Sequence, residues 1–264
     1  MSLDAWKQIP FLRLHRERSW VEDISDDDIP LKQDTTDTHT DDSSSDGERE
    51  DISYEVFVFP AEFYTELQGG NLLTALESFV SLPFIQASIS DLRVQLHAED
   101  THTRWRMFRK NIYLYSLWRI PEEEAFSVFV HEFWHYYDIH TLVPTRFWNM
   151  SERFYELSWQ DIDVLRPWLS TSDFVSGYAM TNMYEDFAES YTYYVLHNAS
   201  FREKKSQSPI LRQKYDFFER YTFPQKQFFN RRFATDERVL PYYWDITKIE
   251  IDIEKFLQYT NLYL

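Results

Sequence analysis

The sequence contains no cysteine and only 4 glycines among its 264 residues. Without cysteine the chain cannot form disulfide bonds, and a bound metal ion must be held by nitrogen and oxygen ligands. The few glycines form neither a GxGxxG nor a GxxxxGKS/T pattern, so nucleotide binding through a glycine-rich phosphate loop has no support. These absences leave histidine and carboxylate side chains as the groups that could carry chemistry.

Long hydrophobic runs are also missing. No stretch approaches the roughly 18 apolar residues that read as a transmembrane helix. The first 20 residues lack the apolar centre of a signal peptide. We expect a soluble protein, either cytoplasmic or exported with its signal removed or by a signal-independent route; the sequence does not indicate the compartment or the oligomeric state.

Negative charge is abundant but unevenly distributed. Residues 22–51 hold 13 Asp and Glu against Lys32 and Arg49, which is −11 of the total net charge of −17 and leaves −6 for the rest. An acidic surface argues against nucleic acid as a partner. Residues 22–51 are also rich in Ser and Thr, so we predict an acidic disordered linker, with an inhibitory pro-segment or a partner-binding tail as alternatives.

The remaining sequence predicts one folded domain over residues 52–264, preceded by an N-terminal segment, 1–21, with a possible short helix. Apolar periodicity and turn signals predict the following elements. The strands are 54–59, 92–96 and 111–117, and the helices are 61–80 (interrupted near Gly69 and Gly70), 121–139, 151–158, 183–196 and 208–220. The predicted fold class is α+β and mostly helical, with a small sheet next to the helix that begins at Pro121.

That helix contains the most informative motif of the chain. Residues 131–135 read His131-Glu132-Phe133-Trp134-His135, the HExxH pattern. On a helix, positions i and i+4 share a face, so both imidazoles can reach one metal ion. Pro121 and three following glutamates suit a helix start, which places the motif well inside the helix. Ordinary histidines that bind nothing are the alternative to a metal site.

Two histidines need a third protein ligand to hold zinc. The metzincin pattern would place glycine at 138 and histidine at 141, where this chain has Asp138 and Thr141. Peptide deformylase requires a cysteine ligand. The remaining HExxH class, the gluzincins, takes a glutamate from a second helix downstream.

The downstream candidate lies in the segment 178–189, YAMTNMYEDFAE. Asn182 is a plausible N-cap for the helix that follows. Glu185 and Glu189 are spaced i and i+4, so one can bind metal while the other hydrogen-bonds a ligand histidine. Alternatively, Glu185 closes a capping box with Asn182, and Glu189 is then the ligand.

These two blocks resemble the catalytic domain of the anthrax lethal factor-like family, shared with Pro-Pro endopeptidases. The resemblance rests on HEFxH followed by Asp138, and on the Tyr-x-x-Thr-Asn-x-x-Glu-x-Phe-Ala-Glu string. It implies a zincin-like fold with Glu185 as the third zinc ligand and Glu189 as the residue supporting a ligand histidine. It also implies that the Tyr178 hydroxyl helps to stabilise the oxyanion.

Several positions depart from that family or admit a second interpretation. Trp134 and Ala179 stand where the family has glycine; Trp134 should face away from the metal on its helix. Asp138 is interpreted as a residue that supports a metal ligand or forms a hydrogen bond on the helix face, with metal ligation as the remaining alternative. Tyr178 has a packing role as its alternative. Arg104, Arg106 and Arg109 form a solvated strand face or, alternatively, bind an acidic substrate.

The resulting hypothesis is a zinc-dependent endopeptidase acting on a protein or peptide substrate. Zn²⁺ would be held by His131, His135 and Glu185, with Glu132 as general base. By fold analogy, the strand around 113–117 would pair with an extended substrate. The alternatives are a non-catalytic binding or effector module on the same scaffold, and a zinc hydrolase acting on something other than a peptide.

Overall fold

Four short strands form a sheet in the computed structural model, which describes residues 56–58, 70–89, 91–97, 105–108, 110–115, 119–138, 140, 150–236 and 238–264. The strands are β1 (Phe57–Val58), β2 (Arg93–Leu96), β3 (Trp105–Phe108) and β4 (Asn111–Leu114). Their order is β1-β2-β4-β3. β1, β2 and β4 are parallel, and β3 is antiparallel to β4. All described residues belong to one unit, Tyr54–Leu264.

β4 is an inner strand of this sheet. Its residue Tyr113 pairs with Gln95 of β2 on one side and with Arg106 of β3 on the other. Because both edges of β4 are used within the sheet, the prediction that the strand around 113–117 pairs with a substrate is wrong. Among the strands of the described residues, β3 forms the edge of the sheet on this side.

The predictions for segments 1–21 and 22–51 lie outside the described residues, as do residues 59–69 of the predicted first strand and helix. The described part of that helix, α3, spans Leu72–Ser81 and begins just after Gly70. A short helix, α4 (Pro83–Gln86), follows it. The predicted interruption near the two glycines therefore agrees with the observed helix start.

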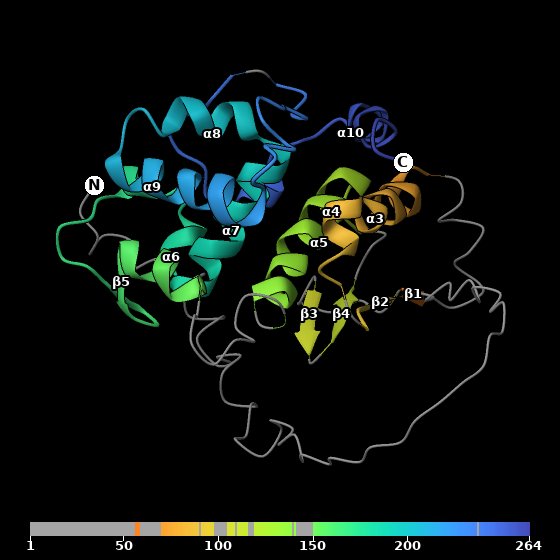
Figure 1. Cartoon of the computed structure of the whole chain (residues 1–264), viewed down its shortest axis with the longest axis horizontal. Coiled ribbons are helices and arrows are strands. Elements are labelled where there is room, and N and C mark those ends of the chain that lie inside the picture. Colours follow the sequence, from red (N-terminus) through yellow and green to blue (C-terminus); the bar gives the residue numbers. More distant parts are fainter. Residues whose placement is uncertain are drawn as a thin grey trace, which may run out of the picture. The chain divides into compact units, whose positions relative to one another are not determined.

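The HExxH helix is α5 (Glu122–Tyr137), with Pro121 as its N-cap and three glutamates in its first turn. Every residue from Ala125 to Tyr137 is buried. α5 contacts the sheet on one side and α7 (Met183–Leu196) on another, as Figure 1 shows. A helix buried on all its faces holds its side chains in fixed positions, which suits a site that needs defined geometry.

The rest of the chain is mostly helical, as predicted. The helices are α6 (Met150–Ser158), α8 (Asn198–Lys204), α9 (Pro209–Phe217) and α10 (Ile253–Thr260), and a hairpin joins β5 (Trp159–Asp161) to β6 (Val164–Leu165). Predicted helix 208–220 differs in part: α9 ends at Phe217 and a π-helical turn, η8 (Phe218–Thr222), continues it. The small sheets and many helices confirm the α+β class.

Aromatic side chains fill the space between α5 and its neighbours. The ring of Trp134 stacks on Tyr191 and also contacts Phe187, with both pairs of centroids 4.4 Å apart. Phe187 in turn stacks on Phe154 of α6 at 4.0 Å. Trp134 is fully buried in this packing. A glycine there, as in the family that the sequence resembles, would leave a large cavity in this core.

Lys204, at the end of α8, is a buried cation in this helical region. Its Nζ lies 3.4 Å from the carbonyl oxygen of Val175 and 3.5 Å from that of Pro241, and 4.8 Å from the centre of the Tyr243 ring. Burial lowers the pKa of Lys204 from 10.5 to about 8. The folded chain therefore holds the Lys204 proton less tightly than the unfolded chain does.

This shift predicts a pH-dependent contribution to stability. Between about pH 8 and 10.5 the unfolded chain binds more protons at Lys204, so stability rises with pH in that window. At roughly 1.4 kcal/mol per pKa unit, the gain is at most about 3 kcal/mol. We expect the stability difference between Lys204→Met and the original chain to shift by about 2 kcal/mol in favour of the original chain from pH 7 to 9.5, measured by urea unfolding. A pH-independent difference would contradict it.

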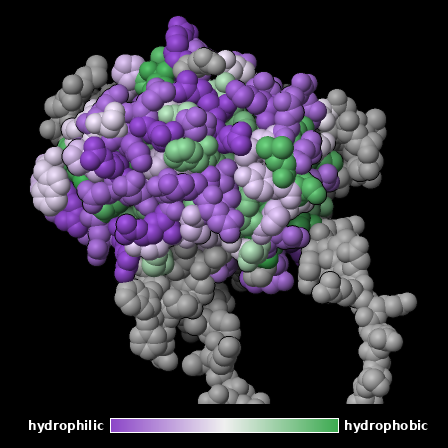
Figure 2. Space-filling model, turned by 45° about the horizontal axis from the view of Figure 1, so that its top comes forward, coloured by the Kyte–Doolittle hydropathy of each residue, from purple (hydrophilic) through white to green (hydrophobic). Residues whose placement is uncertain are grey.

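The face of the molecule drawn in Figure 2 is mostly hydrophilic, with small and separate hydrophobic patches. Within the described ranges, no helix has both the length and the apolar character needed to cross a membrane.

Candidate metal centre

The two histidines of HExxH lie on one face of α5 and are buried. Their ring centroids are 5.2 Å apart. Glu185, in the first turn of α7, faces them: its Oε2 lies 3.0 Å from Nε2 of His131 and 3.7 Å from Nε2 of His135. One ligand atom from each of these three residues lies within 4.8 Å of the other two. The structure therefore brings together the three predicted metal ligands.

Glu185 reaches the histidines because its helix begins at Asn182. The Asn182 side chain accepts hydrogen bonds from the backbone N–H groups of Tyr184 and Glu185, at 2.9 and 3.0 Å. This N-cap was predicted, and the structure confirms it. It fixes where the first turn of α7 starts and so aims Glu185 at α5.

The charges of this cluster favour an ionised carboxylate. Burial alone would raise the pKa of Glu185, but its interactions with His131 and His135 hold that pKa far below its ordinary value. Burial acts against a charged His131, but the adjacent Glu185 and Glu189 raise its pKa well above the usual value. The buried ion pairs of this cluster compete with a metal cation for the same carboxylate. The groups that form these pairs can also serve as the ligands of that cation.

The surroundings of Nε2 of His135 indicate whether a metal ion fits this site. This nitrogen is buried and has no hydrogen-bond partner among the described residues. A buried polar atom without a partner is costly unless something else satisfies it. Two imidazole nitrogens and one carboxylate oxygen are the ligand set of catalytic zinc sites, so His131, His135 and Glu185 fit a zinc ion.

Glu189 lies one turn further along α7 and supports His131 from behind. Its Oε1 is 3.1 Å from Nδ1 of His131, while its Oε2 accepts hydrogen bonds from Ser176 Oγ at 2.6 Å and from the backbone N–H of Ile246 at 2.9 Å. Burial raises the pKa of Glu189, against the effect of these hydrogen bonds. When His131 is neutral, as a metal ligand must be, a carboxylate that accepts from Nδ1–H leaves its Nε2 lone pair directed at the ligand cluster.

Glu132 lies within the same cluster and is completely buried. Its Oε1 is 3.8 Å from Nε2 of His131. This places a carboxylate beside the ligand atoms without making it part of the three-residue cluster, which is the position that a general base requires.

Tyr178 lies near His131, in the 3-10 turn η7 (Tyr178–Met180). The centres of the Tyr178 and His131 rings are 6.1 Å apart. Burial and the nearby carboxylates of Glu185, Glu132 and Glu189 raise the pKa of Tyr178 well above its usual value. Its hydroxyl therefore keeps its proton at neutral pH and can act as a donor.

Asp138 sits at the end of α5 and accepts hydrogen bonds from the hydroxyl groups of Ser151 and Tyr155 on α6. Burial raises its pKa. These contacts correspond to the predicted helix-face hydrogen bond, and they tie the end of the histidine helix to α6.

Trp105 of β3 was not singled out in the sequence. Its ring lies 6.1 Å from the ring of His135, nearly parallel at 24°, and 5.9 Å from that of His131. Ser176 and Ile246 were also missed. Of these missed residues, Ser176 could have been found from local sequence, because it stands two residues before Tyr178. Ile246 could not, because it contacts the site through its backbone.

Among the predicted arginines, Arg106 is exposed on β3, while Arg104 and Arg109 lie outside the described residues.

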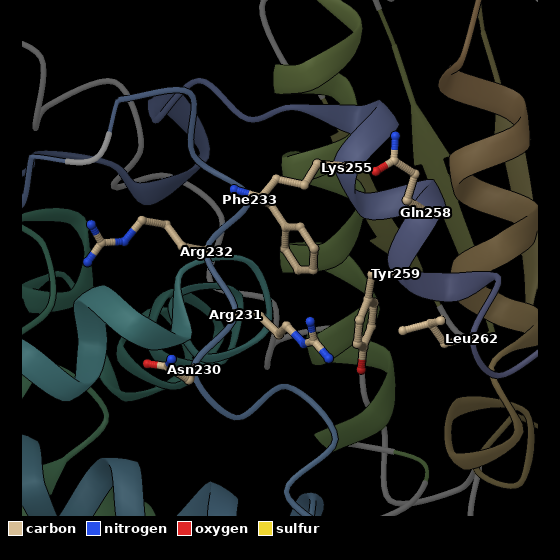
Figure 3. Close-up of a pocket in the computed structure, with 8 residues that line it drawn as sticks. All are labelled: Asn230, Arg231, Arg232, Phe233, Lys255, Gln258, Tyr259 and Leu262. Atoms are coloured by element: carbon tan, nitrogen blue, oxygen red, sulfur yellow. The ribbon is translucent and has the colours of Figure 1, made fainter.

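A pocket elsewhere on the surface, drawn in Figure 3, is lined by cations and rings. Arg231 lies 4.9 Å above the Tyr259 ring, and Arg232 forms an ion pair with Glu203. The lining residues are Asn230, Arg231, Arg232, Phe233, Lys255, Gln258, Tyr259 and Leu262. None of them is a histidine or a carboxylate, so this pocket lacks the side chains that hold zinc in a chain without cysteine.

Residues 109–237 match the model of a protein family described as "Putative zinc-binding metallo-peptidase". The match contains both histidines, Glu132, Glu185 and Glu189. No curated protein and no solved structure matches the chain. The family match supports a zinc metallopeptidase, and the cluster of His131, His135 and Glu185 supports zinc as its metal.

Proposed function

We propose that this chain is a zinc-dependent endopeptidase of the gluzincin type. The observation that carries the proposal is the buried cluster in which ligand atoms of His131, His135 and Glu185 lie within 4.8 Å of one another. The third ligand comes from a second helix and is a glutamate, which is what distinguishes gluzincins from other HExxH enzymes. The family match on residues 109–237 agrees with a peptidase.

Each remaining polar group of the site has a role in this proposal. Zinc, when bound, supplies a Lewis acid that activates water and polarises the scissile carbonyl. Glu132 accepts the proton of the attacking water and delivers it to the leaving amine. Glu189 orients His131, and the Tyr178 hydroxyl donates a hydrogen bond to the oxyanion.

The edge strand β3 is the proposed support for an extended substrate. It ends the sheet order β1-β2-β4-β3, and its residue Trp105 packs beside both ligand histidines. A peptide added to this edge would run past the metal ligands and be held by main-chain hydrogen bonds. This replaces the earlier expectation for the strand around 113–117.

The proposal is tested by metal content and by peptide cleavage on the full chain. We expect one zinc per chain in the purified protein, measured by mass spectrometry, and cleavage of a peptide library that a chelator abolishes and added zinc restores. Zinc without cleavage would indicate a non-catalytic module or a hydrolase of other substrates. Absence of stoichiometric zinc would refute the proposal.

Replacing Tyr178 with phenylalanine tests its role as a donor. We expect kcat to fall by about 10²-fold, the lower end for the loss of one oxyanion donor, with KM and zinc affinity little changed. Tyr221→Phe is the matched control, because the Tyr221 hydroxyl accepts from Arg153 on the surface. If the two variants have equal kcat, Tyr178 has the alternative packing role.

A further inference from the structure

Residues 241–246, here called the strap, run beside the turn that carries Tyr178. The backbone N–H of Gly177 donates to the carbonyl of Tyr243 at 2.9 Å, and that of Tyr178 donates to the carbonyl of Trp244 at 2.7 Å. The strap lies C-terminal to the family match, which ends at residue 237. Two consecutive backbone hydrogen bonds fix the position of the Tyr178 main chain relative to the strap.

The end of the strap meets the same carboxylate oxygen as Ser176 does. Glu189 Oε2 accepts from the backbone N–H of Ile246 at 2.9 Å and from Ser176 Oγ at 2.6 Å. Ser176 Oγ also accepts from the backbone N–H of Ala179 at 3.0 Å. The buried Ser176 therefore joins the Tyr178 turn to Glu189, and Oε2 of Glu189 joins both to the strap, while its Oε1 lies at Nδ1 of His131.

Gly177 lies in close contact with side chains of the strap. A Cβ atom at position 177 would lie 1.8 Å from the Tyr242 hydroxyl oxygen and 2.5 Å from the Trp244 ring. Such distances are far inside van der Waals contact, so the Tyr242 and Trp244 side chains would have to move away from the turn if residue 177 carried a Cβ atom. The chain keeps only 4 glycines, and one of them stands here.

Lys204 contacts the start of the strap. Its Nζ lies near two carbonyl oxygens, that of Val175 before the turn and that of Pro241 at the beginning of the strap. The strap is thus linked to the turn through Lys204 at its start and through two backbone hydrogen bonds in its middle, and to Glu189 at its end.

We propose that Ser176, Gly177 and the strap are a positioning device for the metal centre, which holds Glu189 against His131 and holds Tyr178 over the site. The part of this inference that concerns Tyr178 rests on the proposed function. The part that concerns Ser176 depends only on zinc binding. None of these residues touches a substrate or a reacting atom, so they act through Glu189, His131 and Tyr178.

Two readouts separate positioning from general stability. Loss of a group that orients a ligand histidine weakens metal affinity by about 10- to 100-fold. Displacement of the Tyr178 turn lowers kcat even when zinc is saturating. A merely structural role would lower the unfolding temperature and leave both quantities unchanged.

The first test is Ser176→Ala, compared with Ser208→Ala. Ser208 is a matched control because its buried hydroxyl also donates to a carboxylate at 2.6 Å, that of Asp173, and accepts backbone N–H groups, those of Ile210 and Leu211. We expect the zinc dissociation constant, measured by chelator competition on the full chain, to rise about 10-fold or more for Ser176→Ala only. Equal zinc affinity in both variants would overturn the role of Ser176.

The second test is Gly177→Ala, compared with Gly70→Ala. A Cβ at Gly70 would also clash with a side chain, at 1.7 Å from Oε1 of Glu122, but that clash lies at the start of α5 and not beside the Tyr178 turn. We expect Gly177→Ala alone to lower kcat at saturating zinc, by about 10-fold or more, and to weaken zinc binding. If Gly177→Ala keeps both quantities at the values of Gly70→Ala, the strap has no positioning role.

The outcomes also distinguish this inference from the proposed function. If the original chain binds zinc but cleaves nothing, the peptidase proposal fails and the Ser176 comparison still decides the inference. If Glu132→Gln abolishes cleavage while Ser176→Ala and Gly177→Ala behave like their controls, only the inference fails. If the original chain does not bind zinc, both fail.

Discussion

Glu132→Gln is expected to abolish most peptidase activity, lowering kcat by about 10² to 10⁴, the range for losing a general acid–base group. Glutamine keeps the shape of the side chain but cannot accept the proton of the attacking water. Zinc content should not change, because Glu132 is not one of the three clustered ligand residues. The measurement is kcat on a cleaved peptide, with zinc stoichiometry determined on the same preparation.

The same helix provides the control for this substitution. Glu123→Gln makes an identical chemical change on α5, in its first turn and away from the histidines. We expect it to retain full activity. Because Glu132 is completely buried, removal of its charge should not destabilise the fold. Activity in Glu132→Gln equal to that of Glu123→Gln would exclude Glu132 as the general base.

The parts of the site that local sequence determines were predictable. His131 and His135 share a helix face because of their spacing alone, and Pro121 with its glutamates marks where that helix starts. Asn182 likewise sets the first turn of α7 and therefore the direction of Glu185. In each case the interacting groups lie within a few residues of one another.

The parts that depend on distant pairing were not predictable. The backbone N–H of Ile246 meets Glu189 57 residues earlier in the chain, and a backbone group leaves no trace in residue identity. The order of the strands is likewise a property of the whole sheet, so the sequence around Tyr113 could not show that β4 is internal. Such contacts form only after the elements have docked.

One pair of charges departs from the usual placement of charged residues on helices. Lys214 of α9 and Asp186 of α7 are both completely buried, although charged residues normally mark the solvent side of a helix. Lys214 Nζ lies 2.7 Å from each carboxylate oxygen of Asp186 and 3.2 Å from the carbonyl of Asp173, and Trp159 donates to Asp186 at 2.9 Å. Burial raises the pKa of Asp186 and lowers that of Lys214, while their mutual attraction opposes both shifts.

This pair gives the second large prediction. Lys214→Met should lower the free energy of unfolding by about 3–5 kcal/mol, because it leaves the Asp186 charge buried without its counter-ion. Lys214→Met combined with Asp186→Leu should recover most of that loss, since two apolar side chains replace two charges. Urea unfolding of the two single variants and the double variant measures the coupling between the positions.

An exposed pair of the same geometry is the control. Lys110 and Asp91 are also 2.7 Å apart, but both side chains are exposed to solvent, so Lys110→Met should change stability little.

The double variant also tests whether the Lys214–Asp186 ion pair orients the metal ligand Glu185, because Asp186 directly follows Glu185 in the chain. We expect zinc affinity in the double variant to equal that of the original chain, because the Asn182 cap and not the ion pair sets the first turn of α7. A stable double variant with weakened zinc binding would show instead that the Lys214–Asp186 pair positions Glu185.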